Sequence, residues 1–300
     1  EISACLVGSE MCIRDSLLDE VCSHFKQVET EEKEDRLKIA IVGKPNAGKS
    51  RLTNALLGYD RTIVSDIAGT TRDAIDTPLD VDGKKYTLID TAGIRRKRSV
   101  SEDLEYYSVL RSFAAIRRAD VCLIVIDAFE GLTEQDVKIA GYVHEQGKPS
   151  IIVMNKWDKV EKDTHTINEF EKKIQTDLAF MDYYKSIYIS AKNGQRTNKL
   201  FGLCEEVYAN AGKRITTGTL NDVISDAVRA NEPPTKNGRR LKIYYAVQDG
   251  VYPPTFILFV NSQELMHFSY KRYIENTIRK TFGFEGTPIR IFIHEKQEDN

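Results

Sequence analysis

An eight-residue segment at positions 43–50, Gly-Lys-Pro-Asn-Ala-Gly-Lys-Ser, constrains what this chain can fold into more than any other feature. It follows the apolar run Leu37–Val42 and opens the helical stretch Lys49–Leu57. The spelling fits GxxxxGK[ST], a loop whose backbone N–H groups wrap phosphate oxygens between a buried strand and a helix. Because strand, loop and helix occur in the required order, the sequence predicts a phosphate-binding loop.

Two side chains of this loop carry predicted chemistry of their own. Lys49 is expected to neutralise the β- and γ-phosphates of a nucleotide, which makes it a candidate catalytic residue. The hydroxyl of Ser50 is expected to bind Mg²⁺. The other residues of the loop predicted to contact the nucleotide are Gly43, Lys44, Pro45, Asn46, Ala47 and Gly48.

A second motif, Asp90-Thr91-Ala92-Gly93, follows the predicted strand Tyr86–Ile89. An acidic side chain at the end of a strand near a phosphate loop is well placed to hold the metal, so Asp90 is a predicted Mg²⁺ ligand. Gly93 lets its backbone N–H approach the γ-phosphate closely and is a candidate catalytic position. The remaining predicted contacts of this segment are Thr91, Ala92 and Ile94.

The type of base is indicated by Asn155-Lys156-Trp157-Asp158, which follows the predicted strand Ile151–Met154. The carboxylate of Asp158 can accept hydrogen bonds from N1–H and the 2-amino group of guanine, and adenine offers no donors there. A site built for these bonds rejects a ligand lacking them by about 10⁴-fold or more. Asn155 is predicted to tie this loop to the phosphate loop, and the stem of Lys156 to cover the base.

Further along the chain, Ser190, Ala191 and Lys192 follow the predicted strand Ile187–Ile189 and are expected to close the base pocket. Taken together, the four motifs predict a guanine-nucleotide site. An ATPase or kinase interpretation conflicts with the segment Asn155–Asp158.

The segment Asp66–Asp73 between the first two motifs is a predicted switch. A threonine hydroxyl here can reach Mg²⁺ only when a γ-phosphate orders the loop, so we predict Thr71 as a metal ligand and catalytic residue, helped by Thr70. The alternative is an ordinary capped turn.

Hydrolysis needs a further contribution, because Ile94 stands where Ras-type proteins carry a water-positioning glutamine. We hypothesise that a bound potassium ion, held by Asn46, Thr70 and loop carbonyls, stabilises the developing charge.

Strands alternate with helical stretches such as Leu104–Arg117 and Glu134–Glu145 as far as about Gly212. This order predicts an α/β domain with a doubly wound, mostly parallel sheet. From residue 212 onwards the predicted order is helix, strand, strand, short helix, helix, strand. The helix Leu220–Arg229 is expected to be capped by Thr219. The strands Leu241–Val247, Thr255–Val260 and Ile289–His294 and the helix Tyr270–Phe282 are expected to form a small α+β domain.

The predicted organisation has four parts. Residues 1–16 are expected to be foreign, adapter-like sequence, and residues 17–36 a remnant helix with an acidic linker. Residues 37–211 are the predicted nucleotide-binding domain, and residues 212–300 the small domain. The last part contains 13 Lys and Arg against 10 Asp and Glu, so it is mildly basic within a chain of net charge −2.

Composition adds limits to this interpretation. The five cysteines have no zinc-ligand spacing and do not pair as a disulfide framework, so reduced thiols in a cytoplasmic protein are expected. The longest apolar runs, such as Val121–Ile126, are too short to span a bilayer, and no membrane partner is predicted.

In the spellings GKPNAGKS, DIAGTTRD, DTAGIRRKRS and NKWD, the chain resembles the Era/TrmE-like GTPases. With the C-terminal unit it resembles the second half of the Der (EngA) family, double GTPases of bacterial ribosome assembly, truncated at its N-terminus. The resemblance implies a KH-like C-terminal domain, a GTP/GDP and Mg²⁺ cycle, and hydrolysis stimulated by potassium. It further implies partners in the large (50S) ribosomal subunit, its precursor and rRNA. We expect a monomer.

Three segments of the sequence bear on possible RNA binding. Gly283-Phe284-Glu285-Gly286 spells the clamp motif GxxG, but it follows the long helix, so we interpret it as a chain turn. The basic run Arg95–Arg98 fits an RNA contact or a solvated loop equally well. Residues Lys271, Arg272, Tyr273 and Arg279 fit an RNA surface, a G-domain surface or, more simply, the wet side of an amphipathic helix.

Two functions from other classes compete with a GTP-hydrolysing switch. A nucleotide-regulated RNA scaffold with negligible turnover fits Ile94, which cannot orient water. A tRNA-modification GTPase is disfavoured because the chain ends without the cysteine motif of that family.

Overall fold

A computed structural model describes residues 36–58, 62–64, 76–90, 103–161, 163, 165–233, 235–236 and 238–296. The predicted foreign segment 1–16, the predicted remnant helix and the predicted switch 66–73 lie outside these residues. Every helix within the described ranges is too short or too polar to cross a membrane.

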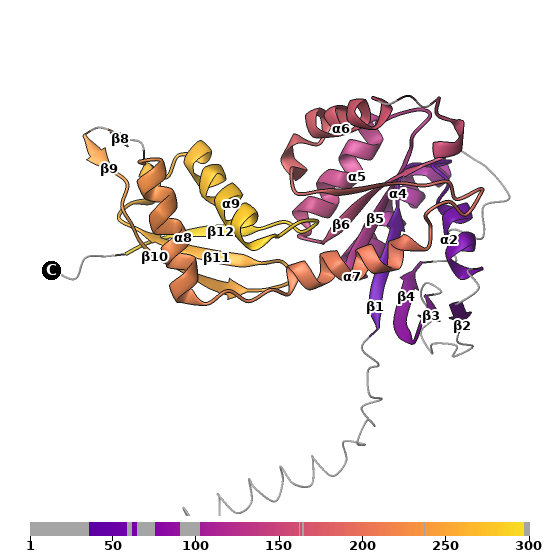
Figure 1. The fold of residues 1–300 in the computed structure, drawn as a ribbon, viewed down its shortest axis with the longest axis horizontal. Coiled ribbons are helices and arrows are strands. Elements are labelled where there is room, and N and C mark those ends of the chain that lie inside the picture. Colours follow the sequence, from indigo (N-terminus) through magenta and orange to yellow (C-terminus); the bar gives the residue numbers. More distant parts are fainter. Residues whose placement is uncertain are drawn as a thin grey trace, which may run out of the picture. The chain divides into compact units, whose positions relative to one another are not determined.

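A seven-stranded sheet forms the centre of the predicted nucleotide-binding domain (Figure 1). Its strands follow the order β2-β3-β4-β1-β5-β6-β7. Neighbouring pairs from β4 to β7 are parallel, whereas β2 and β3 form an antiparallel edge. The bounds in sheet order are Thr62–Val64, Thr77–Val81, Lys84–Ile89, Leu37–Val42, Val121–Asp127, Ser150–Asn155 and Lys185–Tyr188. The predicted mostly parallel, doubly wound sheet is confirmed.

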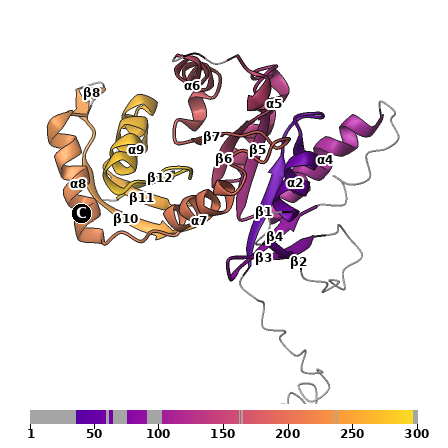
Figure 2. The same ribbon diagram turned by 45° about the vertical axis from the view of Figure 1, so that its right-hand side comes forward.

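Helices cover both faces of this sheet (Figures 1 and 2). One face packs against α2 (Lys49–Leu57) and α7 (Lys199–Ala211). The opposite face packs against α4 (Asp103–Arg118), α5 (Glu134–Glu145) and α6 (Thr166–Asp177). Because the central strands β5 and β6 are buried on both faces, they read as continuous apolar runs rather than as alternating patterns.

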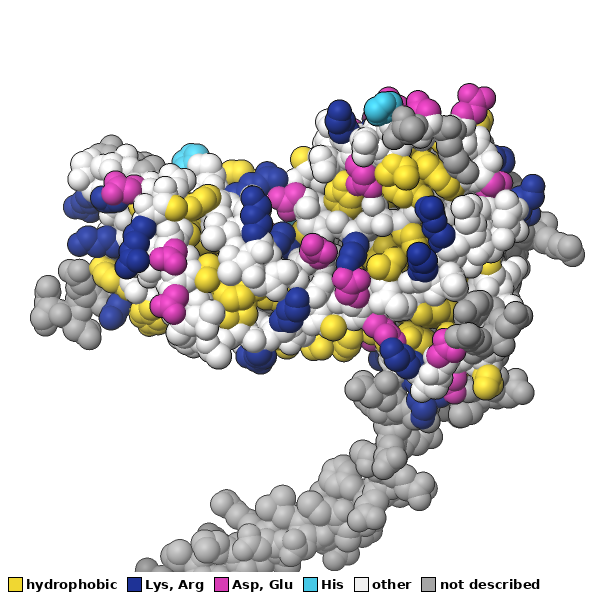
Figure 3. Space-filling view, viewed as in Figure 1, with side chains coloured by type: hydrophobic (Ala, Val, Ile, Leu, Met, Phe, Trp, Pro, Cys, Tyr) yellow, Lys and Arg dark blue, Asp and Glu magenta, His cyan; other side chains and the backbone are white. Residues whose placement is uncertain are grey.

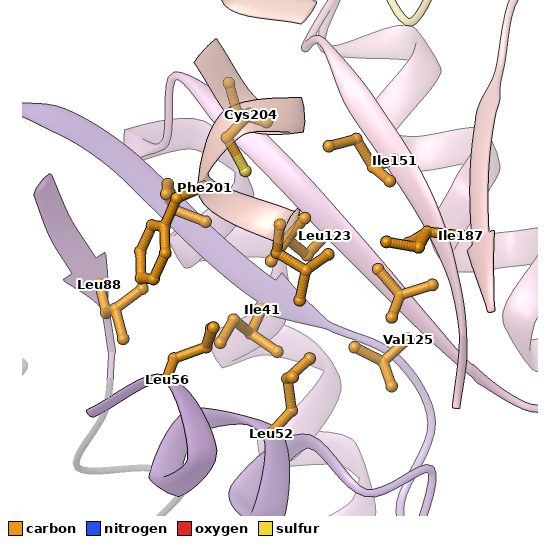
Figure 4. Packing of buried hydrophobic residues seen from close by; sticks show 14 of the residues in the cluster. Ile41, Leu52, Leu56, Leu88, Leu123, Val125, Ile151, Ile187, Phe201 and Cys204 are labelled. Carbon is orange, nitrogen blue, oxygen red and sulfur yellow. The ribbon is translucent and has the colours of Figure 1, made fainter. Parts of the chain in front are cut away.

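The core on the α2 side joins elements that are far apart in the sequence. Figure 4 shows Leu52 of α2 and Phe201 of α7 on the side of the sheet that carries Ile41 and Leu123. Each of these side chains is at most 7% exposed. Their burial fixes the start of α2, and with it the phosphate loop, against the ends of β1 and β5.

The small domain consists of two helices on one face of a three-stranded sheet. The sheet order is β10 (Ile243–Gly250), β11 (Thr255–Val260), β12 (Arg290–Glu295), with β10 and β11 antiparallel and β11 and β12 parallel. Helices α8 (Thr217–Ala230) and α9 (Phe268–Phe282) share one core with the inward-facing residues of these strands. Shorter elements are the 3₁₀ turns Trp157–Lys159, Ala179–Met181 and Gln263–Leu265 and the two-residue strands Thr235–Lys236 and Arg239–Arg240.

Three expectations for the small domain need correction. Helix α8 begins earlier than predicted, and its N-cap is Thr216, whose side chain accepts a hydrogen bond from the backbone N–H of Thr219 at 3.4 Å. Strand β10 begins at Ile243 rather than Leu241, because Lys242 instead bonds Asn261 through its backbone. Between α8 and β10, where the predicted order has no strand, the chain forms the small β8–β9 pair.

The segment Gly283–Gly286 turns the chain, as predicted. Gly283 ends α9 in the left-handed conformation at φ 69°. Gly286, at φ 72°, donates its N–H to the carbonyl of Tyr183 at 2.7 Å and accepts from the N–H of Ser150 at 2.8 Å. A Cβ on Gly286 would lie 2.2 Å from a methyl of Val207, so the packing against α7 requires glycine at this position.

Charged side chains of both signs are interspersed over the face of the molecule drawn in Figure 3, with apolar atoms in scattered patches. The sequence left open whether basic residues of α9 form an RNA surface, a G-domain surface or the wet side of the helix. Arg279 is 9% exposed and donates to the carbonyls of Phe284 and Thr287, both at 2.7 Å. Arg272 donates to the carbonyl of Ala179 at 2.9 Å. Both arginines thus make intramolecular contacts.

Candidate functional site

The predicted phosphate loop connects β1 to α2 and is shaped by two glycines. Gly43 has φ 147°, and a Cβ there would lie 2.3 Å from the carbonyl oxygen of Val125. Gly48 has φ 98°, and a Cβ there would lie 2.2 Å from Nδ2 of Asn155. Neither position has room for a side chain, so the loop backbone is held close to β5 and to the start of the predicted base-reading loop.

Lys49 is folded onto this loop. Its Nζ donates to the carbonyls of Gly43 and Lys44, both at 2.6 Å. These bonds keep the ammonium group at the mouth of the loop. There a phosphate oxygen could replace one of the two carbonyls as the hydrogen-bond acceptor of Lys49. The backbone N–H groups at the start of α2 add positive potential for the same ligand.

Asn155 joins the two halves of the candidate site. Its Nδ2 donates to the carbonyl of Ala47 at 2.9 Å, and its Oδ1 accepts from the backbone N–H of Ala191 at 3.0 Å. The side chain is 2% exposed, so both bonds are shielded from water. The phosphate loop, the Asn155–Asp158 segment and the 190–192 segment are therefore cross-linked by one amide.

Asp158 is oriented by Ser190, another of the predicted pocket residues. The Ser190 hydroxyl donates to Oδ1 of Asp158 at 2.6 Å, and this bond lowers the pKa of the carboxyl below its ordinary value. Asp158 is thus ionised at neutral pH and can act only as an acceptor, which suits the donors on guanine.

The acidic partner of Lys156 was not predicted from the sequence. Asp127, at the end of β5 and 2% exposed, forms an ion pair with the ammonium group of Lys156. Lys156 itself has a left-handed backbone at φ 61°. The ion pair restrains the stem of this lysine, which the sequence predicts to cover the base.

A similar anchor holds the second residue of the phosphate loop. Lys44 is 7% exposed, and its Nζ lies 2.9 Å from Glu130 and 3.6 Å from Asp136 at the start of α5. Burial alone would lower the pKa of Lys44, but the two carboxylates outweigh it and raise the pKa. No pattern in the sequence marked either carboxylate as a partner of Lys44, because the contacts depend on how α5 and the residues before it pack beside the loop.

The predicted magnesium ligands are only partly within the described residues. Asp90 follows β4, which pairs in parallel with β1 through Ala40 and Ile89, so Asp90 and the phosphate loop lie at the same edge of the sheet. The hydroxyl of Ser50 and the carboxylate of Asp90 are oxygen ligands of the kind Mg²⁺ prefers. Among the described residues, no group of three His, Cys, Asp or Glu side chains could hold a metal by itself. The predicted site residues outside the described ranges are Thr70, Thr71, Thr91, Ala92, Gly93 and Ile94.

Replacing Asn155 with Ala tests the cross-link. The change leaves the carbonyl of Ala47 and the N–H of Ala191 without their partner, which we expect to lower the unfolding free energy by about 2 kcal/mol and nucleotide affinity by about tenfold or more. Denaturant unfolding and fluorescent-nucleotide titration measure the two effects. Asn210→Ala, which removes a partly buried bond to the carbonyl of Glu285 at 3.0 Å, is the matched control and should spare affinity. Equal nucleotide affinity in the two variants would contradict the role of Asn155.

A mostly parallel sheet with this loop at the carboxyl ends of its strands, followed by a predicted base-reading loop bonded to it, defines the fold of a P-loop GTPase. Two protein-family models that match the chain agree with this class. The family model described as "50S ribosome-binding GTPase" matches residues 38–156. The model described as "KH-domain-like of EngA bacterial GTPase enzymes, C-terminal" matches residues 214–294.

Individual curated relatives match a larger share of the chain than either family model does. The chain is 59% identical over 283 residues to GTPase Der of Ruminiclostridium cellulolyticum and 55% identical over 284 residues to that of Acetivibrio thermocellus. Each match covers 94% of this chain and 64% of the relative. The chain is therefore similar over most of its length to GTPases of the Der (EngA) family, and it spans less than two-thirds of the length of these relatives.

Among solved structures, a variant of Aquifex aeolicus Era bound to GDP.AlF4- aligns with 86% of this chain and 92% of its own. The sequence identity of this pair is 22% and the TM-score is 0.44.

Proposed function

We propose that this chain binds GTP with Mg²⁺, hydrolyses it to GDP and phosphate, and acts as a switch in assembly of the large ribosomal subunit. The observation that carries the proposal is the pair of bonds made by Asn155, which links the phosphate loop to the Asp158 loop. One ligand with a triphosphate at one end and guanine at the other would contact both loops. The similarity to GTPases of the Der family and the description of the model matching residues 38–156 support the ribosomal role.

The chain's own residues would divide the work in a definite way. Lys49 and the loop N–H groups would bind the β- and γ-phosphates and the charge that develops during transfer, and Asp158, held by Ser190, would select guanine. Bound Mg²⁺ would supply electrostatic stabilisation of the phosphates, with Ser50, Asp90 and Thr71 as its proposed ligands. Gly93 is the proposed N–H contact to the γ-phosphate.

Steady-state turnover of GTP by the chain, with and without purified 50S subunits, tests the proposal, and ATP is the negative control. We expect GTP turnover that rises on addition of 50S subunits and co-sedimentation with them in the GTP-bound state. Tight GTP binding with absent turnover would instead favour the scaffold interpretation suggested by Ile94. Failure to bind the ribosomal subunit in any nucleotide state would contradict the assembly role.

Potassium dependence is the finer part of the proposal. Asn46 stands exposed at the tip of the phosphate loop with φ 64°, so its amide oxygen is accessible to a cation beside the phosphates. Thr70 and neighbouring carbonyls would complete an oxygen shell, and carbonyl oxygens can replace the hydration shell of a potassium ion.

Exchanging KCl for NaCl at equal ionic strength tests this part. We expect single-turnover hydrolysis to be about tenfold or more faster in KCl, because a bound cation would stabilise charge that isoleucine at position 94 cannot stabilise. Asn46→Ala should remove most of the difference between the salts. Equal wild-type rates in KCl and NaCl would rule out the potassium site.

Cellular context and assembly state complete the proposal. We propose that the chain works in the cytoplasm, where ribosomes assemble, and that it acts as a monomer on its ribosomal partner.

A further inference from the structure

The sheet of the small domain has two faces of different composition. Phe256, Leu258 and Val260 of β11 are fully buried and belong to the core shared with α8 and α9. The alternating residues Ile257 and Phe259 point to the opposite face and are partly exposed. Both helices lie on the first face (Figures 1 and 2), so the second face of the described sheet is accessible.

Aromatic rings form a row across this accessible face. Tyr245 of β10 pairs with Phe259 of β11, and Phe259 pairs with His294 of β12. The Tyr245 and Phe259 rings are stacked with centroids 4.3 Å apart and planes 15° apart, and the Phe259 and His294 rings are 5.7 Å apart. In the next row, Phe292 pairs with Ile257 and is 52% exposed. The rings are held in place by the strands and leave apolar surface open to a ligand.

Positive charge lies at the edge of the same row. The ammonium group of Lys296 lies 5.9 Å from the ring centroids of both Tyr244 and Tyr245. The neighbouring Glu295 has the opposite strand parity, and its carboxylate accepts hydrogen bonds from Ser262 at 3.1 Å and from the backbone of Gln263 at 2.5 Å. The acidic residue of β10, Asp249, lies at the far end of that strand beside the Gln248/Gly250 bulge. At the Lys296 end, therefore, a cation borders the aromatic row.

We propose that this aromatic face, Tyr245, Phe259, Phe292 and His294 with Lys296, binds single-stranded RNA. Every base has a π-face that stacks on aromatic side chains, and a lysine beside the rings can contact the connecting phosphate. This combination of rings and a bordering cation favours a polyanion with flat bases over an apolar protein surface. The proposal rests on the proposed ribosomal function and names the part of the chain that would hold an unpaired rRNA segment.

Anisotropy titration of a fluorescent oligouridine with the full chain tests the proposal. Tyr245→Leu and Phe292→Leu keep apolar bulk but remove a stacking ring, and each should weaken binding by about tenfold. Lys296→Gln should weaken binding and reduce the slope of log affinity against log salt by about 0.7. Phe268→Leu, at a 73% exposed aromatic at the start of α9, and Lys280→Gln, on the exposed side of α9, are matched controls that should bind as the wild type does.

The outcomes separate this proposal from the proposed function. GTP hydrolysis without RNA should be unchanged in all five variants, and thermal unfolding checks that each is folded. Wild-type affinity for oligouridine in Tyr245→Leu, Phe292→Leu and Lys296→Gln would overturn the RNA assignment while leaving the GTPase proposal intact. Loss of 50S binding in these variants with oligouridine affinity retained would identify a protein-docking face and would also overturn it. Ring-dependent RNA binding in a chain without GTP turnover would contradict only the proposed function.

Discussion

Replacing Lys49 with Ala is expected to reduce GTP affinity by about 10²- to 10³-fold. The ammonium group of Lys49 already lies at the mouth of the phosphate loop, bonded to the carbonyls of Gly43 and Lys44 at 2.6 Å. Truncating one member of a hydrogen-bonded charge pair costs about 2–5 kcal/mol, and the triphosphate would lose its principal counter-charge. Titration with a fluorescent GTP analogue measures the loss.

A lysine outside the site provides the control. Lys172 is exposed on α6, and Lys172→Ala should bind GTP as tightly as the wild type. Thermal unfolding of both variants separates lost contact from lost fold. Retained affinity in Lys49→Ala would show that the phosphates bind elsewhere.

The second large effect is expected from Asp158→Asn, which should reverse base preference. An amide in place of the carboxylate offers one donor and one acceptor, so it no longer matches the two donors of guanine but matches the N1–H and 2-oxo group of xanthine. Ser190 can still donate to the remaining oxygen, so the loop should keep its shape. We expect the ratio of XTP to GTP affinity to rise by about 10⁴-fold, the scale on which such hydrogen-bonding sites discriminate.

Asp163→Asn is the matched control for this substitution. Asp163 is also a carboxylate that accepts from a hydroxyl, that of Thr166 at 2.8 Å, but it lies just before α6 and is not part of the predicted base-reading segment Asn155–Asp158. Competition titrations with GTP, XTP and ATP measure both variants. An unchanged GTP preference in Asp158→Asn would place the base pocket elsewhere.

The sequence predicted the elements that carry strong local signals. Helix α2 has the predicted bounds Lys49–Leu57, because the phosphate-loop glycine Gly48 marks its start and Gly58 its end. Strands β5 and β6 were evident as apolar runs because they are buried on both sides. Strand β3 was missed, since Pro78 and Asp80 interrupt its pattern even though Leu79 is buried.

The parts of the site that the sequence did not predict depend on tertiary contacts. Asp127 pairs with Lys156 across 29 positions of the chain, and Lys44 reaches Asp136 only because α5 packs beside the phosphate loop. Acidic residues are common in this chain, so neither partner stood out before β5, α5 and the loop were placed. By contrast, the Asn155 link to the phosphate loop followed from its motif alone.

One ligand is expected to span the two loops that Asn155 connects. Competition binding to the wild-type chain tests this most directly, because it compares the affinities of ligands that can contact one loop or both. A bound fluorescent GDP is displaced with GTP, ATP and inorganic triphosphate in Mg²⁺ and KCl. We predict displacement by GTP at a concentration about 10⁴-fold or more below that required for ATP or triphosphate. Equal displacement by GTP and ATP would contradict the account, because the Asp158 loop would then take no part in binding.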